Sequence, residues 1–251
     1  MIVCTALAAC LLAPASAGAG RPAVSLVASP SHVALAGAAR QTIQVTNSGR
    51  EAVVVDVSRA GFALDLRGRP RVVAGGRQTW IAVRPHRLAI GPGGTASLVV
   101  SSKPPARAEP GDHDTLVLLT TRARGDGGLG VRMRLGVVVV VRVPGKIIRR
   151  LDVRSLRVRR HGPGGRLELL VANRGNVTEV LGRGCVTVSL RRAGRLLARL
   201  QPTPRQLLPR TSGIAELRYR GTGRGWASAR VEVVGRGNCA KARRRVFHIR
   251  L

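Results

Sequence analysis

The chain has 251 residues, of which 43 are lysine or arginine and 12 are aspartate or glutamate, so its formal charge is +31. Aromatic residues make up only 2% of the chain, and glycine occurs 31 times. This length suits one large domain or two ordinary ones. Because single-stranded nucleic acid is bound through several aromatic stacking platforms, the scarcity of aromatics disfavours that class of partner.

The positive charge comes almost entirely from arginine. Only Lys103, Lys146 and Lys241 are lysines, which leaves 43 − 3 = 40 arginines. One interpretation is a surface that binds a polyanion. The other is a coding bias, because arginine, alanine, glycine and proline have G+C-rich codons and lysine does not. The second is favoured, so the charge assigns no partner by itself.

The first 19 residues, MIVCTALAACLLAPASAGA, are apolar and uncharged. They are too few to remain as a membrane helix, and "ASA" and "AGA" both fit the A-x-A cleavage pattern of secreted proteins. Residues 1–19 are therefore predicted to be a cleaved signal peptide of an extracytoplasmic protein. Lipid attachment at Cys10 is a second possibility, disfavoured by the apolar residues that follow it. Peripheral membrane contact is left open.

Residues 22–144 show short apolar–polar alternations separated by Gly, Pro, Asn and Ser. In "RQTIQVTNSG", Ile43 and Val45 alternate with polar neighbours, and "EAVVVDVS" places Val53, Val55 and Val57 on one face. About seven such segments at 8–12-residue spacing predict a β-sandwich of immunoglobulin (Ig) type.

Residues 145–251 repeat this pattern, with arginine often at the alternate position, as in "ELRYR" and "VFHIRL". Alternation places these arginines in water and the apolar residues in a core. The fold class predicted is all-β, with two tandem Ig-like β-sandwich domains, 22–144 and 145–251, after the signal peptide.

The two halves also share motifs in the same order. Val45–Gly49 (VTNSG) matches Val171–Gly175 (VANRG) at an offset of 126 residues. "IGPGGTASL", ending at Leu98, matches "LPRTSGIAEL", ending at Leu217, at an offset of 119. These matches predict two diverged copies of one sandwich.

A run of five valines, Val137–Val141, lies between arginines near the end of the first half. A membrane helix needs about 20 apolar residues, so the run is predicted to be the centre of a long strand. Its odd-numbered valines would fill the first core. Val138 and Val140 would lie on the other face and need cover, expected from the second domain or from the linker around Ile147 and Ile148, although another protein could also supply it.

The predicted mature chain keeps two cysteines, Cys185 and Cys239. Two cysteines in an exported protein most simply form a disulfide. Closing so long a loop would contribute about 4 kcal/mol in the chain-entropy model.

A search for catalytic and metal-binding patterns finds none. Asp112-His113-Asp114 is interpreted as a turn that enters a strand, because adjacent residues of a strand face opposite sides. No zinc-ligand spacing, phosphate loop or G-x-S-x-G elbow is present. The predictions are therefore no enzyme activity, no catalytic residues, no cofactor and no metal.

The motifs "NSG" after an early strand, "PGG" before a later one and "PGDH" opening the next resemble bacterial envelope Ig-like domains. Their arrangement is similar to WxL-interacting cell-surface proteins and, more distantly, to two-domain periplasmic pilus chaperones. The resemblance implies an envelope location and binding rather than catalysis. The chaperones bind a subunit's terminal carboxylate with defined basic residues, and the resemblance assigns no ligand-binding residue in this chain.

The function predicted is a non-enzymatic cell-envelope protein that contacts an anionic wall polymer, peptidoglycan or a surface protein. The alternative is a chaperone-like module that captures a partner's strand at a sheet edge. Nucleic acid is not expected as the physiological partner.

Overall fold

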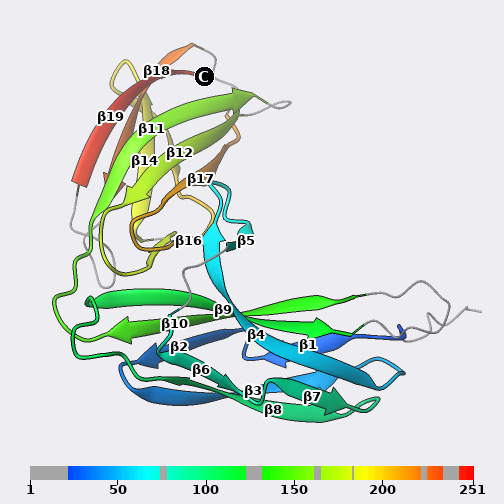
Figure 1. The fold of residues 1–251 in the computed structure, drawn as a ribbon. Coiled ribbons are helices and arrows are strands. Elements are labelled where there is room, and N and C mark those ends of the chain that lie inside the picture. Colours follow the sequence, from blue (N-terminus) through cyan, green and yellow to red (C-terminus); the bar gives the residue numbers. More distant parts are fainter. Residues whose placement is uncertain are drawn as a thin grey trace, which may run out of the picture.

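The computed structural model describes residues 22–73, 78–122, 132–160, 165–182, 184–221, 225–233 and 243–251. These residues form nineteen β-strands and no helix, arranged as two sandwiches (Figure 1). The predicted fold class of two tandem Ig-like sandwiches is confirmed. Within the described ranges, no helix could cross a membrane. The predicted signal peptide, residues 1–19, lies outside these ranges.

The first sandwich comprises strands β1 to β10. One sheet has the order β1-β3-β8-β6, and the opposite sheet has the order β2-β10-β9-β4-β5, with β7 also paired to β4. Apolar side chains from alternate positions of both sheets form one core. The strands are β1 Leu26–Ser29, β2 His32–Ala36, β3 Ala39–Asn47, β4 Val53–Leu64, β5 Pro70–Val73, β6 Ile81–Arg84, β7 Arg87–Ile90, β8 Thr95–Ser102, β9 Gly111–Thr121 and β10 Arg134–Val143.

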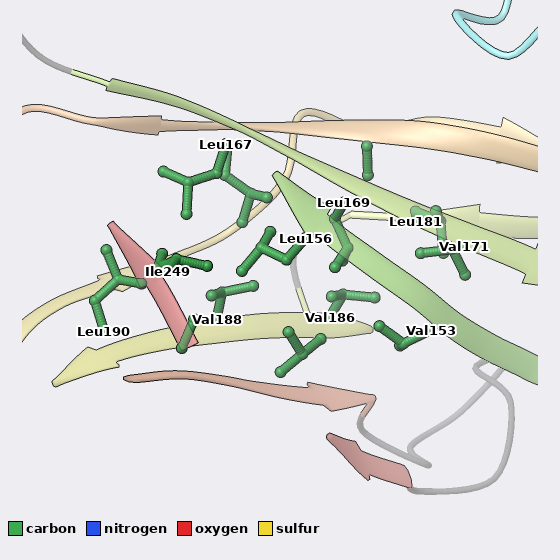
Figure 2. Packing of buried hydrophobic residues seen from close by; sticks show 14 of the residues in the cluster. Val153, Leu156, Leu167, Leu169, Val171, Leu181, Val186, Val188, Leu190 and Ile249 are labelled. Carbon is green, nitrogen blue, oxygen red and sulfur yellow. The ribbon is translucent and has the colours of Figure 1, made fainter. Parts of the chain in front are cut away.

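The second sandwich comprises β11 to β19. It contains a sheet β11-β12-β17, a sheet β15-β14-β18-β19 and a short pair β13-β16. Figure 2 shows its separate core, in which Leu167, Leu169 and Val188 are completely buried. The strands are β11 Leu151–Arg160, β12 Gly165–Asn173, β13 Glu179–Leu181, β14 Val186–Arg192, β15 Arg195–Leu200, β16 Arg205–Leu207, β17 Ser212–Tyr219, β18 Trp226–Val233 and β19 Arg243–Arg250.

A buried asparagine closes the same turn in each sandwich. Asn47, at the end of β3, donates its Nδ2 hydrogens to the backbone oxygens of Glu51, Ile90 and Gly91 at 2.7, 3.2 and 3.2 Å. Its Oδ1 accepts the Gly49 N–H at 3.0 Å. The side chain thus ties the turn after β3 to the end of β7.

Asn173, at the end of β12, makes the corresponding set of bonds. Its Nδ2 donates to the oxygens of Val177, Leu207 and Leu208 at 2.8, 3.1 and 3.2 Å, and its Oδ1 accepts the Gly175 N–H at 2.9 Å. Both asparagines are fully buried. The predicted internal repeat is therefore a repeat of hydrogen bonding as well as of sequence.

The strand pairing corrects one of the predicted offsets. Thr46 pairs with Thr95, and the residue 126 positions after Thr46, Ala172, pairs with Ser212. Thr95 and Ser212 are 117 residues apart, whereas the sequence motifs had suggested 119. Shifting one strand by two residues leaves each of its side chains on the same face of the sheet. The alternation of apolar and polar residues therefore cannot distinguish an offset of 117 from one of 119.

Strand β4 is longer than its sequence pattern indicates. The alternation of valines stops at Val57, but β4 continues to Leu64 and pairs there with β5. Figure 1 shows the β4–β5 hairpin leaving the first sandwich and reaching β16 and β17 of the second.

Backbone hydrogen bonds join the tip of this hairpin to the second sandwich. The oxygen of Leu66 accepts the N–H of Ile214 in β17 at 2.7 Å. Arg205 in β16 donates from Nη2 to the Asp65 oxygen at 3.0 Å and from Nη1 to the Ile214 oxygen. The hairpin therefore acts as a strut between the two sandwiches.

Replacing Arg205 with alanine is expected to loosen this strut. The variant loses the guanidinium hydrogen bonds to Asp65 of the hairpin and Ile214 of β17, which should lower the free energy of unfolding by about 1–3 kcal/mol. Unfolding followed by calorimetry should separate into two transitions, and the radius of gyration measured by X-ray scattering should rise. The control is Arg67→Ala, which removes only ion pairs of an arginine side chain that is 52% exposed, each worth less than about 1 kcal/mol. A single unchanged transition in the Arg205 variant would contradict the assignment.

Candidate partner-binding cleft

Strand β10 has one face in the first core, as its sequence pattern predicts. Val137, Val139 and Val141 are fully buried there, and Met133 and Leu135 pack against the same core at the beginning of the strand. The opposite face belongs to the side of the sheet that is turned towards the second sandwich (Figure 1).

Val138 and Val140 lie on that opposite face and are only half-buried. Val138 is directly opposite Leu116 of β9, which is itself buried. The linker residues Ile147 and Ile148, expected as cover, are 41% and 44% exposed. This face of the sheet therefore keeps partly exposed apolar side chains.

The first part of β10 has an open edge. Strand β2 pairs with β10 from Val138 to Arg142 only, and the Val138 N–H donates to the Ser31 oxygen at 3.1 Å. N-terminal to Ser31, the chain crosses to the other sheet, where β1 pairs with β3. Within the described residues, no strand pairs with β10 on this side between Arg134 and Val137.

The direction of the backbone groups follows from alternation. The Met133 N–H and oxygen bond to Thr121 on the β9 side, so the groups of Arg134 and Gly136 point to the open side. An edge of this kind presents N–H and C=O groups that can pair with another strand. Sequence reasoning missed this edge, although "HVALA" after Ser29-Pro30 signals a strand that resumes in a new place.

Asp112 of β9 is one of the contacts that hold the two sandwiches together. Its carboxylate accepts two hydrogen bonds from Arg142 at 2.7 and 2.9 Å and one from the Thr178 N–H of the second sandwich at 2.8 Å. Burial opposes ionisation, but the bonds from Arg142 and Thr178 outweigh it and lower the pKa of Asp112. The carboxylate therefore bridges β9, β10 and the second sandwich in its charged form.

Asn176 forms a second contact beside it. The Asp112 N–H donates to the Asn176 oxygen at 2.8 Å, and Asn176 Nδ2 donates to the Pro110 oxygen at 2.8 Å. Gly111 lies between them with φ +123°, and a Cβ there would come within 2.1 Å of the Asn176 oxygen. Only glycine therefore permits this close approach of the two sandwiches.

A pocket of about 240 Å³ lies next to these contacts. It is lined by Phe62, Gln78, Glu109, Pro110, Asp112, His113, Asp114, Asn176, Pro209 and Arg210, so both sandwiches contribute. Asp114 is directly opposite Val140 in the sheet, and its Oδ1 is buried without a hydrogen-bond partner. Burial, together with the nearby Asp112 charge, raises the pKa of Asp114 to about 7.

The side chain of His113 lies on the opposite face of β9 from those of Asp112 and Asp114. Its ring packs edge-on against Trp80 with centroids 5.5 Å apart, and its Nε2 lies 2.7 Å from the Glu109 oxygen. Burial lowers the pKa of His113. The three residues lie at the start of β9 rather than in a turn before it, and within the described residues no group of three metal-binding side chains occurs.

The predicted disulfide is not placed by the structure. Cys185 comes directly before β14 and is partly buried against the second core. Cys239 lies outside the described residues. The Cys185–Cys239 bond stays a prediction.

Comparison with known proteins identifies the architecture. No family model and no characterised protein sequence matches the chain. One solved structure, from a chaperone–tip adhesin complex in the biogenesis of CFA/I fimbriae, aligns with a TM-score of 0.51 and 10% identity. The class 5 fimbriae chaperone CfaA aligns with a TM-score of 0.51 and 11% identity. Each alignment covers 88% of this chain and 98% of the other.

The chain has the fold of these fimbrial chaperones. This bears out the more distant of the two resemblances suggested by the sequence. The comparisons give no support to the resemblance with WxL-interacting proteins. At such low identity the likeness concerns the fold, and the residues of the cleft must be interpreted on their own contacts.

Proposed function

We propose that the protein is a non-enzymatic, chaperone-like module that captures a strand of a partner protein along the open edge of β10. The observation that carries this proposal is the backbone of Arg134 and Gly136, which pairs with no described strand on the side of β10 that faces away from β9. The alternative function considered from the sequence is thus preferred to binding of a wall polymer as the main role. An extracytoplasmic location is part of the proposal.

The side chains around the edge are consistent with strand capture. A partner strand paired with Arg134 to Val137 would continue the sheet, and its own side chains would alternate between its two faces. On the core side it would meet Met133 and Leu135, which are only partly buried. On the opposite face it would meet Val138, which is half-buried. An alternating apolar strand of a surface protein fits this environment.

The test separates backbone pairing from side-chain contact. Arg134→Pro removes the N–H that points to the open side, whereas Arg134→Ala keeps it. A photo-reactive amino acid at Arg132, introduced into each variant in native cells, should cross-link to one strand of one protein in the alanine variant. In the proline variant the yield should fall to background. The stability of both variants should stay within about 1 kcal/mol of the parent, because the altered group has no intramolecular partner.

The same photo-reactive residue at Arg40, an exposed position on β3 of the other sheet, is the control for accidental proximity. It should yield no common product with Arg132. Equal cross-linking in the proline and alanine variants would show that the edge does not pair with a strand, and the proposal would then fail.

A further inference from the structure

The second sandwich has a groove that strand capture does not use. It has a volume of about 440 Å³ and lies between the outer strand of one sheet, β11, and the outer strand of the other, β19. The side chains of Leu156 and Ile249, both buried, belong to it. Arg245 of β19 donates from Nη1 to the Val153 oxygen of β11, so the two strands are tied together beside the groove.

Trp226 lines this groove and is 68% exposed, more than any other large apolar side chain in the described part of the chain. The chain has only two tryptophans. Leaving so large an apolar surface in water gives up free energy that burial would provide. A flat, exposed indole ring at the mouth of a groove is therefore a candidate contact surface.

Arginine side chains line the same groove as Trp226. Arg250 is directly opposite Trp226 in the pairing of β18 with β19, and Arg157 and Arg159 line the other side of the groove. Arg159 contacts Glu168 at 3.3 Å, whereas Arg157 and Arg250 have no ion-pair partner among the described residues. No carboxylate is among the residues that line the groove. Two guanidinium groups are thus free to bind anions.

We propose that this groove binds an anionic polysaccharide, with one sugar ring stacked on Trp226 and its carboxylate or phosphate groups held by Arg157 and Arg250. The C–H bonds on the face of a sugar ring carry partial positive charge and suit the negative face of an indole. Guanidinium groups bind carboxylates and phosphates in a two-pronged geometry. A groove that runs between two extended strands suits a linear polymer.

A sugar polymer fits better than the other polyanions. Single-stranded nucleic acid is held by successive aromatic platforms, whereas the other four aromatic residues, Phe62, Trp80, Tyr219 and Phe247, are all buried or half-buried. The aspartate and glutamate residues of an acidic peptide have the charges but no ring to place on Trp226. The site is separate from the β10 edge, so it would give the protein a second attachment point.

The test measures binding of polygalacturonate to the purified protein by calorimetry at about 0.15 M salt, where exposed charges are partly screened. Trp226→Ala should weaken binding about tenfold, since stacking of the ring is lost. Arg157→Ala combined with Arg250→Ala should weaken it at least about tenfold. The matched control, Arg40→Ala combined with Arg107→Ala, removes the same charge from exposed positions of the first sandwich and should change affinity less than about twofold.

Other outcomes would overturn the proposal. An equal loss in the Arg40 and Arg107 control would show that binding follows net charge alone. Poly-L-glutamate bound as tightly as polygalacturonate, with the same dependence on Trp226, would show that no sugar is recognised. Tighter binding of oligo-dT through Trp226 would assign the groove to nucleic acid. Arg134→Pro should leave polygalacturonate binding unchanged, so this result is independent of the strand-capture test.

Discussion

Replacing Asp114 with asparagine is expected to raise the free energy of unfolding by about 4 kcal/mol at pH 8 and to change it little at pH 4. The folded-state pKa of Asp114 is about 7, whereas an unfolded aspartate titrates near 3.9. Between these values the unfolded chain releases a proton that the folded chain retains. Stability of the parent therefore falls as pH rises from about 4 to about 7, and the asparagine variant lacks this loss.

The control is the same substitution two residues earlier on the same face of β9. Asp112 is held in its charged form by Arg142 and Thr178, which lower its pKa. Its contribution to stability is present above the unfolded pKa and is lost as pH falls through the folded one. Asp112→Asn should therefore destabilise the protein by about 2 kcal/mol at pH 8. Denaturant unfolding at pH 4 and pH 8 measures the free energy of unfolding of both variants. If the two substitutions changed it in the same direction at pH 8, this account would be refuted.

Replacing Asn47 or Asn173 with alanine should cost about 3 kcal/mol or more of the stability of its own sandwich. Each side chain is fully buried and satisfies three backbone oxygens and one N–H. A buried polar group left without a partner costs about 1–3 kcal/mol, and each substitution leaves several. Denaturant unfolding followed by circular dichroism provides the measurement.

Gln41→Ala provides the comparison for Asn47, because Gln41 is on the same strand and its side chain is exposed. It should change stability by no more than about 0.5 kcal/mol. If Asn47→Ala cost no more than Gln41→Ala, the buried asparagine would not be what closes the turn. A loss at Asn47 with none at Asn173 would show that the two sandwiches do not share this feature.

The fold class, the internal repeat and the two faces of strand β10 could be predicted from the sequence alone. Alternation of apolar and polar residues is a local signal, and it assigns each side chain to one of two faces without knowledge of the partner strand. For this reason the valines of β10 were correctly divided into a core set and a second set at Val138 and Val140. The Asn-x-Gly motifs were found for the same reason, since a turn depends on residues next to each other in the chain.

The partners of these strands and the surroundings of their side chains could not be predicted from the sequence, because they depend on segments distant along the chain. The open edge of β10 exists because β1 joins the opposite sheet, and nothing local in β10 reports where β1 goes. The offset of 117 given by strand pairing differs by two residues from the offset of 119 suggested by the sequence. Both offsets place each side chain on the same face of the strand, so only the observed pairing can distinguish them. Asp112 and Asp114 are both aspartates on the same face of β9, but their pKa values shift in opposite directions. They do so because Arg142 and the Thr178 N–H donate to the Asp112 carboxylate and not to that of Asp114, and both donors come from segments distant in sequence.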